Sequence, residues 1–171
     1  MPITIRLSRR SFMASAALSA SVLLATLPLA PSAFAQTGTA SFTVNVDEHG
    51  VALKGYDPVA YFAQAKPSKG LPNFSARHEG ATYWFSSAAN RDAFNAGPDK
   101  FKPAFGGYCA MGVALDKKLD IDPTLWRVVD GKLFLNVHQG AQTRWLEDVP
   151  GNIALANKNW LRIKDMDPKQ L

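Results

Sequence analysis

The chain has 171 residues, 47% of them hydrophobic and 19% charged, which is the composition of a globular protein. Its formal charge of +5 includes Arg6, Arg9 and Arg10, and beyond residue 35 only 16 basic residues face 14 acidic ones. Such a small, dispersed excess argues against a nucleic-acid-binding protein, and the single cysteine, Cys109, excludes an internal disulfide.

The first 35 residues have the three parts of an export signal. Ser8–Met13 contains a paired arginine in a fitting context, an Ala- and Ser-rich apolar stretch covers 14–29, and Ala33 and Ala35 form a cleavage signal. We predict a twin-arginine signal peptide over 1–35, cleaved after Ala35, with the twin-arginine translocase as partner during export and the periplasm as destination. The alternative is an ordinary secretory signal. The apolar stretch is too short for a good membrane span, so we expect no stable membrane anchor.

The rest of the chain predicts one small α+β domain with two antiparallel hairpins and about three short helices. We expect an N-terminal tail and short strand over 36–50, with the strand at 42–46, a domain over 51–161 and a C-terminal tail over 162–171. Glu79-Gly80 and Asp130-Gly131 predict hairpin turns between strands 74–78 and 81–85, and between strands 125–129 and 132–136.

Capping and stop signals predict the helices. Ser86 or Ser87 can cap a helix that runs to about Ala96, a second helix covers 139–148 and ends at Pro150-Gly151, and a third covers 153–161. No internal repeat is apparent.

The segment Phe105–Gly112 is the candidate site. Gly106 and Gly107 allow positive φ or a close backbone approach, and Tyr108 precedes the lone thiol of Cys109. That thiol has three interpretations: a thiolate metal ligand, a redox thiol, or a small buried side chain.

A metal needs further ligands. Cys109, Met111 and one imidazole, with His138 as the candidate, would suit copper(I) or a similar soft or transition metal ion. A capping or surface role is the alternative for His138, His78 is expected to be exposed, and His49 lies in a polar turn. The spacing of cysteines and histidines does not support a structural zinc site.

Several ordered motifs resemble those of exported bacterial YHS-domain proteins over about residues 51–161. They are Gly55–Phe62, Ser87–Phe94, Pro98–Phe101, Gly106–Ala110, Val129–Leu133 with Trp126, and Asn157–Trp160. The resemblance implies kinship with small domains proposed to bind heavy metals through several cysteines, whereas this chain has only Cys109. Some members of the exported group resemble selenoproteins with selenocysteine at the matching position, which implies a redox or soft-metal role for Cys109.

Two functions follow as hypotheses. The first is a periplasmic soft-metal-binding or thiol-redox protein centred on Cys109, whose thiol should then be partly exposed and have a depressed pKa. The second is a non-catalytic periplasmic module that binds a ligand or a protein, with Cys109 only packing in the core. In that case Tyr56, Asp57 and Tyr61, together with Gly106, Gly107 and Tyr108, would shape the binding surface. No arrangement of nucleophile and base can be read, so the sequence does not decide whether the protein is an enzyme.

Overall fold

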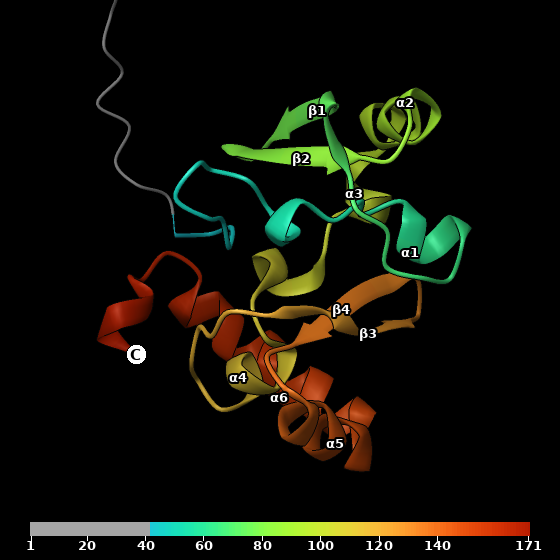
Figure 1. The fold of residues 1–171 in the computed structure, drawn as a ribbon. Helices are drawn as coiled ribbons and strands as arrows, with labels where there is room; N and C mark the ends of the chain where they lie inside the picture. Colours follow the sequence, from blue (N-terminus) through green and yellow to red (C-terminus); the bar gives the residue numbers. More distant parts are fainter. Residues whose placement is uncertain (1–41) are drawn as a thin grey trace, which may run out of the picture. The chain divides into compact units, whose positions relative to one another are not determined.

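A computed structural model describes residues 42–171, and the predicted signal peptide lies outside the described residues. The fold is α+β, as predicted, with two separate two-stranded antiparallel sheets. Strands β1 (Leu71–His78) and β2 (Ala81–Phe85) form the first hairpin, and β3 (Asp122–Val129) and β4 (Lys132–Asn136) form the second. Figure 1 shows that each hairpin has its own helices beside it.

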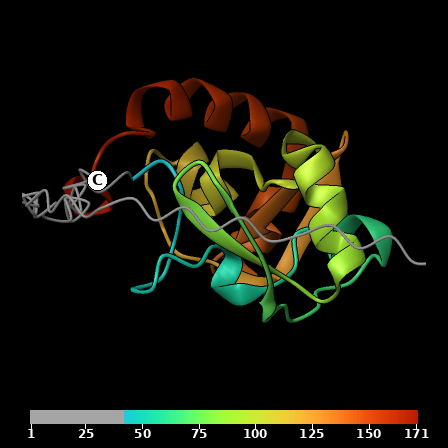
Figure 2. The same cartoon turned by 90° about the horizontal axis from the view of Figure 1, so that it is seen from above.

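The described part of the chain contains six α-helices rather than about three. They are α1 (Ala60–Ala63), α2 (Ala88–Ala96), α3 (Pro98–Phe101), α4 (Ala110–Ala114), α5 (Gln139–Glu147) and α6 (Val149–Ile163). Short 3-10 turns occur at η1 (Leu53–Gly55), η2 (Ala104–Gly107) and η3 (Pro168–Gln170). Figure 2 shows α6 running beside α4, against which it packs.

Both predicted hairpin turns and two helix starts are confirmed. Asp130 and Gly131 have φ of 48° and 72°, the positive values that a type I′ turn requires. Ser87 Oγ accepts the Asn90 N–H at 3.2 Å and so caps α2. Helix α5 begins at the expected residue, with His138 as its cap.

Two element predictions are wrong. The segment 42–46 forms only an isolated bridge between Val46 and Ala52, because its backbone pairs instead through contacts such as Asn45 N–H to Gly106 O. Pro150 does not stop a helix: it stands in the first turn of α6, where the missing N–H costs nothing, and Asp148 caps that helix.

The expectation that the chain has no internal repeat is also wrong. In both hairpins the register shifts at the same place: Leu71 pairs with Phe85 before the irregularity in the first, and Asp122 pairs with Asn136 before it in the second. Leu71 and Asp122 lie 51 residues apart in the chain, and so do Phe85 and Asn136. The turns match as well, since Glu79 has φ of 49°, close to the 48° of Asp130.

The equivalence continues on both sides of the hairpins. Leu53, Lys54 and Gly55 in η1 have φ of 54°, 52° and 74°, and Phe105, Gly106 and Gly107 in η2 have φ of 53°, 59° and 81°. Gly97 and Asp148 end α2 and α5 with the same unusual backbone, ψ being 74° and 78°. The domain is therefore built from two ββα repeats, residues 51–101 and 103–163.

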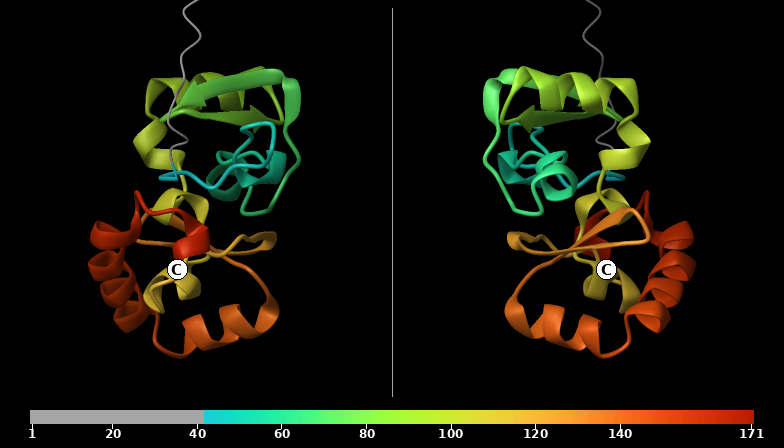
Figure 3. Two further views of the ribbon diagram at one scale, coloured as in Figure 1. Left: turned by 90° about the vertical axis from the view of Figure 1, so that its left-hand side faces the viewer. Right: turned by 90° about the vertical axis from the view of Figure 1, so that its right-hand side faces the viewer.

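The core lies within and between the two repeats. Fully buried aromatic residues come from both, with Tyr61, Tyr83, Phe85 and Phe94 in the first repeat and Trp145 in the second. Figure 3 shows the β1–β2 half and the β3–β4 half, with α5 and α6 following the second hairpin. Because each hairpin alone is marginally stable, the shared core accounts for a stable domain.

Candidate functional site

Backbone geometry brings Cys109 to the start of α4. Gly106 has φ of 59°, and a Cβ added there would lie 1.9 Å from the carbonyl oxygen of Thr43, so only glycine fits. The chain then passes Gly107 and Tyr108, and the Cys109 N–H donates to the Leu119 carbonyl at 2.9 Å. The paired glycines of the candidate segment therefore position the thiol by allowing a close backbone approach.

The Cys109 side chain is fully buried and already hydrogen-bonded. Its Sγ accepts the Gly112 N–H at 3.3 Å, which caps α4, and donates to Asn136 Oδ1 at 3.6 Å. Asn136 is itself buried, and its Oδ1 also accepts the Met111 N–H at 3.3 Å. The thiol thus serves as a small capping group within the core.

Burial also sets the charge state of this thiol. Desolvation raises the pKa of Cys109 above its ordinary value, although N–H groups of Gly112, Val137 and Met111 partly offset the effect. The thiol is therefore protonated at neutral pH. The two properties expected of a reactive cysteine, exposure and a depressed pKa, are both missing from this arrangement.

The structure brings Cys109, Met111 and His138 to one pocket of about 280 Å³. Apolar side chains from α4, the following loop and the residue after β4 supply its walls: Met111, Leu115, Leu119 and Val137. Three basic side chains also line it, those of Lys117, His138 and Arg144, and all three are exposed. No acidic residue is among the residues lining this pocket, which we call the Cys109 pocket.

The three predicted metal ligands do not fit a soft metal ion as they stand. Such an ion requires a thiolate, whereas Cys109 is covered, protonated and hydrogen-bonded on both sides. His138 Nδ1 accepts the Ala141 N–H at 3.1 Å as the cap of α5, which leaves only Nε2 free. The capping role that the sequence offered as an alternative for His138 is confirmed.

The internal repeat allows the surroundings of Cys109 to be compared with those of an equivalent residue. Its equivalent in the first repeat is Asp57, which is also fully buried. The Asp57 carboxylate accepts the Val59 N–H at 2.8 Å, the Ser86 N–H at 2.8 Å and Oγ at 2.7 Å, and the Asn90 side-chain amide at 2.6 Å. In the first repeat, a polar network fills this place.

The second repeat has smaller or apolar groups at the same positions. Ser87 and His138 cap equivalent helices, so Asn90, whose N–H binds the first cap, corresponds to Ala141, whose N–H binds the second. By the same count Ser86 corresponds to Val137. Ala141 has no side chain long enough to reach the buried group, and it lines the Cys109 pocket.

The other predicted binding residues support the fold. Asp57 and Tyr61 are buried, and the Tyr61 hydroxyl donates to the Pro123 carbonyl at 2.9 Å. Burial raises the pKa of Tyr61, and it raises the pKa of Tyr108 to about 12. The Tyr108 hydroxyl donates to the Phe42 carbonyl at 3.0 Å. Tyr56 is half-buried under the Lys69 ammonium, 4.2 Å from its ring centroid.

A second, larger cleft of about 400 Å³ lies where the two repeats meet. Its lining combines aromatic residues of both repeats, among them Tyr83 and Phe134, which are equivalent in the two hairpins. Gly106 is the one predicted binding residue that lines it. Sequence patterns could not reveal this cleft because its residues come from five different elements.

Comparisons of the chain with protein-family models, with curated proteins and with solved structures found no match. The resemblance to exported YHS-domain proteins therefore stays a prediction. Within residues 42–171, none of the helices combines the length and the apolar character needed to cross a membrane.

Proposed function

We propose that the protein is a non-catalytic periplasmic binding module that holds a small amphiphilic anion, such as a medium-chain carboxylate, in the Cys109 pocket. The observation that carries the proposal is the difference between the repeats. The first repeat closes this position with Asn90, and the second leaves it open with Ala141 beside three basic side chains. The proposal develops the second of the two functions expected from the sequence.

The walls of the pocket favour an apolar ligand body. Leu115 and Leu119 are 45% and 40% exposed, although Met111, deeper in the pocket, is nearly covered. Large exposed apolar side chains around a concave surface are typical of ligand sites. A volume of about 280 Å³ is just below the usual range for ligand pockets, which suits a chain of several methylene groups rather than a large cofactor.

The charges favour an anionic head group. Arg144 forms no ion pair with any residue that the structure describes, so its planar guanidinium is available to a carboxylate in a two-pronged geometry. Lys117 Nζ donates to the Leu171 carbonyl at 3.0 Å and contributes positive charge nearby. With no acidic residue in the lining, a ligand carboxylate would meet only attraction.

The state of the thiol supports a binding role over catalysis. A protonated, covered Cys109 is a poor nucleophile, and the Nδ1 atom of His138 is engaged in capping α5. The thiol instead forms a firm part of the pocket floor, since hydrogen bonds to Gly112 and Asn136 hold it in place. A preformed floor lowers the ordering cost of binding.

Calorimetric titration of the purified chain with octanoate tests the proposal. Wild type should bind octanoate, and Ala141→Asn, which restores the filling group of the first repeat, should weaken binding at least tenfold. Arg144→Gln should weaken it about fivefold to thirtyfold, because a charge-assisted hydrogen bond contributes roughly 1–2 kcal/mol. Ala154→Asn and Lys158→Gln, both on the exposed part of α6, are matched controls and should leave the affinity unchanged.

The competing hypothesis of a soft metal at Cys109 makes a different prediction. Metal analysis of the protein from its native periplasm should then find near-stoichiometric metal that is lost in Cys109→Ser. That result, or octanoate binding that is unaffected by Ala141→Asn, would overturn the proposed function.

A further inference from the structure

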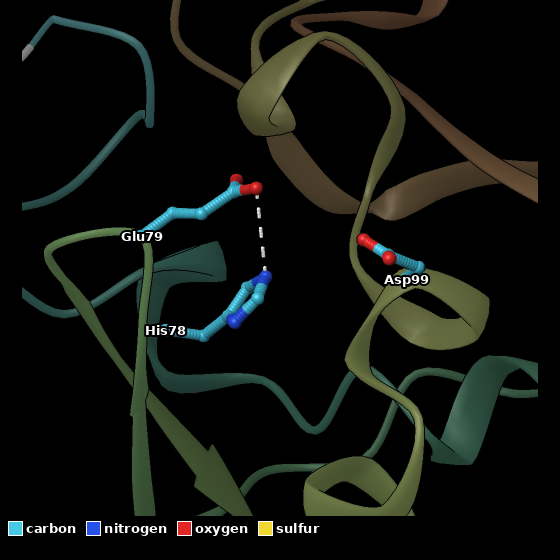
Figure 4. A group of neighbouring side chains, drawn as sticks. All are labelled: His78, Glu79 and Asp99. Atoms are coloured by element: carbon cyan, nitrogen blue, oxygen red, sulfur yellow. Dashed lines mark ion pairs between the residues drawn. The ribbon is translucent and has the colours of Figure 1, made fainter.

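Three side chains with metal-ligating atoms converge at the end of the first hairpin. His78 is the last residue of β1, Glu79 occupies the turn, and Asp99 lies in the first turn of α3. One ligand atom from each lies within 4.8 Å of the others. Figure 4 shows the His78 ring and the Glu79 carboxylate facing one another, with Asp99 across from them on the neighbouring helix.

The His78 imidazole is held in place and has a ring nitrogen that makes no hydrogen bond. Its ring meets the edge of Phe94 at 5.8 Å between centroids and an interplanar angle of 86°. Its Nε2 is shut off from solvent, makes no hydrogen bond, and lies 3.6 Å from Glu79 Oε1. Buried polar atoms are nearly always satisfied, so an imidazole nitrogen that makes no hydrogen bond beside two carboxylates is available to bind a metal ion.

The two carboxylates are already arranged around a positive charge. The Lys102 ammonium lies 2.7 Å from Glu79 Oε1 and 2.7 Å from Asp99 Oδ1. A single ammonium thus bridges the two carboxylates. The position therefore stabilises a cation, and the lysine occupies it from within the chain.

We propose that His78 Nε2 and the carboxylates of Glu79 and Asp99 bind a divalent transition metal ion of the zinc type, which displaces the Lys102 ammonium. One imidazole and two carboxylates are borderline and hard ligands that suit such an ion better than a soft one. Glu79, Asp99 and Lys102 all line the 400 Å³ cleft between the repeats. With three protein ligands, the fourth position is left for water or for a small molecule in that cleft.

The inference does not depend on the proposed function of the Cys109 pocket. That pocket and this cleft have no lining residue in common. Metal binding at His78 and octanoate binding beside Cys109 can therefore succeed or fail separately, and Cys109→Ser should leave zinc binding unchanged.

Zinc titration of the purified chain by calorimetry tests the inference, with four variants. His78→Ala and Asp99→Asn should each weaken binding at least tenfold. Lys102→Gln should strengthen binding several-fold, because it removes the internal cation that competes for both carboxylates. His49→Ala is the matched control: His49 also lies beside a glutamate, 3.5 Å from Glu48, but has no third ligand and should leave the affinity unchanged.

The Lys102 variant distinguishes a built site from adventitious binding. Zinc held loosely by exposed histidines would respond equally to His49→Ala and His78→Ala, and would not tighten in Lys102→Gln. Either result would overturn the inference, as would a lack of zinc binding in both wild type and Lys102→Gln. Since Asp99 is exposed, Asp99→Asn should fold normally and keeps the test informative even if His78→Ala is unstable.

Discussion

Replacing Asp57 by alanine should destabilise the protein far more than replacing Cys109, although the two residues occupy equivalent places in the repeats. The Asp57 carboxylate accepts hydrogen bonds from the backbone N–H groups of Val59, Ala60 and Ser86, and from the side chains of Ser86 and Asn90. Side chains can reorient, but the backbone donors cannot. Each of the three backbone donors left unsatisfied costs roughly 1–3 kcal/mol, which gives at least about 3 kcal/mol for Asp57→Ala.

Cys109→Ala removes less. The sulfur makes two longer hydrogen bonds, at 3.3 and 3.6 Å, and its loss leaves a small void next to an existing pocket. We expect a cost of about 1–2 kcal/mol. Urea unfolding followed by circular dichroism measures both values. Equal costs, or a larger cost for Cys109→Ala, would refute the argument that Asp57 anchors a filled polar network and Cys109 only a cap. If Asp57→Ala does not fold, Asp57→Asn, which keeps one acceptor oxygen, should still be less stable than Cys109→Ala.

Two further predictions concern charge and backbone. Burial lowers the pKa of Lys118 to about 8, while its ammonium donates to the carbonyls of Phe42, Lys164 and Met166. The unfolded chain therefore holds this proton more tightly than the folded one. We expect the free energy of unfolding of wild type, relative to that of Lys118→Met, to rise between pH 8 and the ordinary lysine pKa near 10.5. A flat or falling difference in urea titrations would contradict this. Gly80→Ala should cost roughly 1–2 kcal/mol of stability because of its positive φ. Gly106→Ala should cost more, because the added Cβ at Gly106 also meets a backbone oxygen, whereas the one at Gly80 meets nothing. Equal losses of melting temperature would show that the close approach at Gly106 does not matter.

The hairpins and the longer helices could be predicted because their signals are local. An acidic residue followed by glycine fixes a turn with two positive φ values, and Ser87 can cap a helix on its own. Helices of four or five residues, such as α1, α3 and α4, carry too few residues for a periodic pattern. Pro150 is an ambiguous signal because proline both ends helices and begins them.

The repeat and the pockets needed the three-dimensional structure. Equivalent positions change chemistry, as in the buried Asp57 and Cys109, and Ser87 and His138 do so with the same extended backbone. The sequence signals of the repeat are two: the Gly-Tyr steps at Gly55 and Gly107, 52 residues apart, and the acidic-Gly turns at Glu79 and Asp130, 51 residues apart. Residue type alone points to Cys109, Met111 and His138, which do share a pocket, whereas Arg144 and Ala141 matter only through their place beside it.

The most direct test of the account is octanoate binding by wild type and Ala141→Asn, measured side by side with Ala154→Asn. The account predicts binding by wild type and Ala154→Asn, and at least a tenfold loss in Ala141→Asn with its stability retained. Equal affinity in all three proteins would contradict it, since the open position beside Cys109 would then not be the binding site.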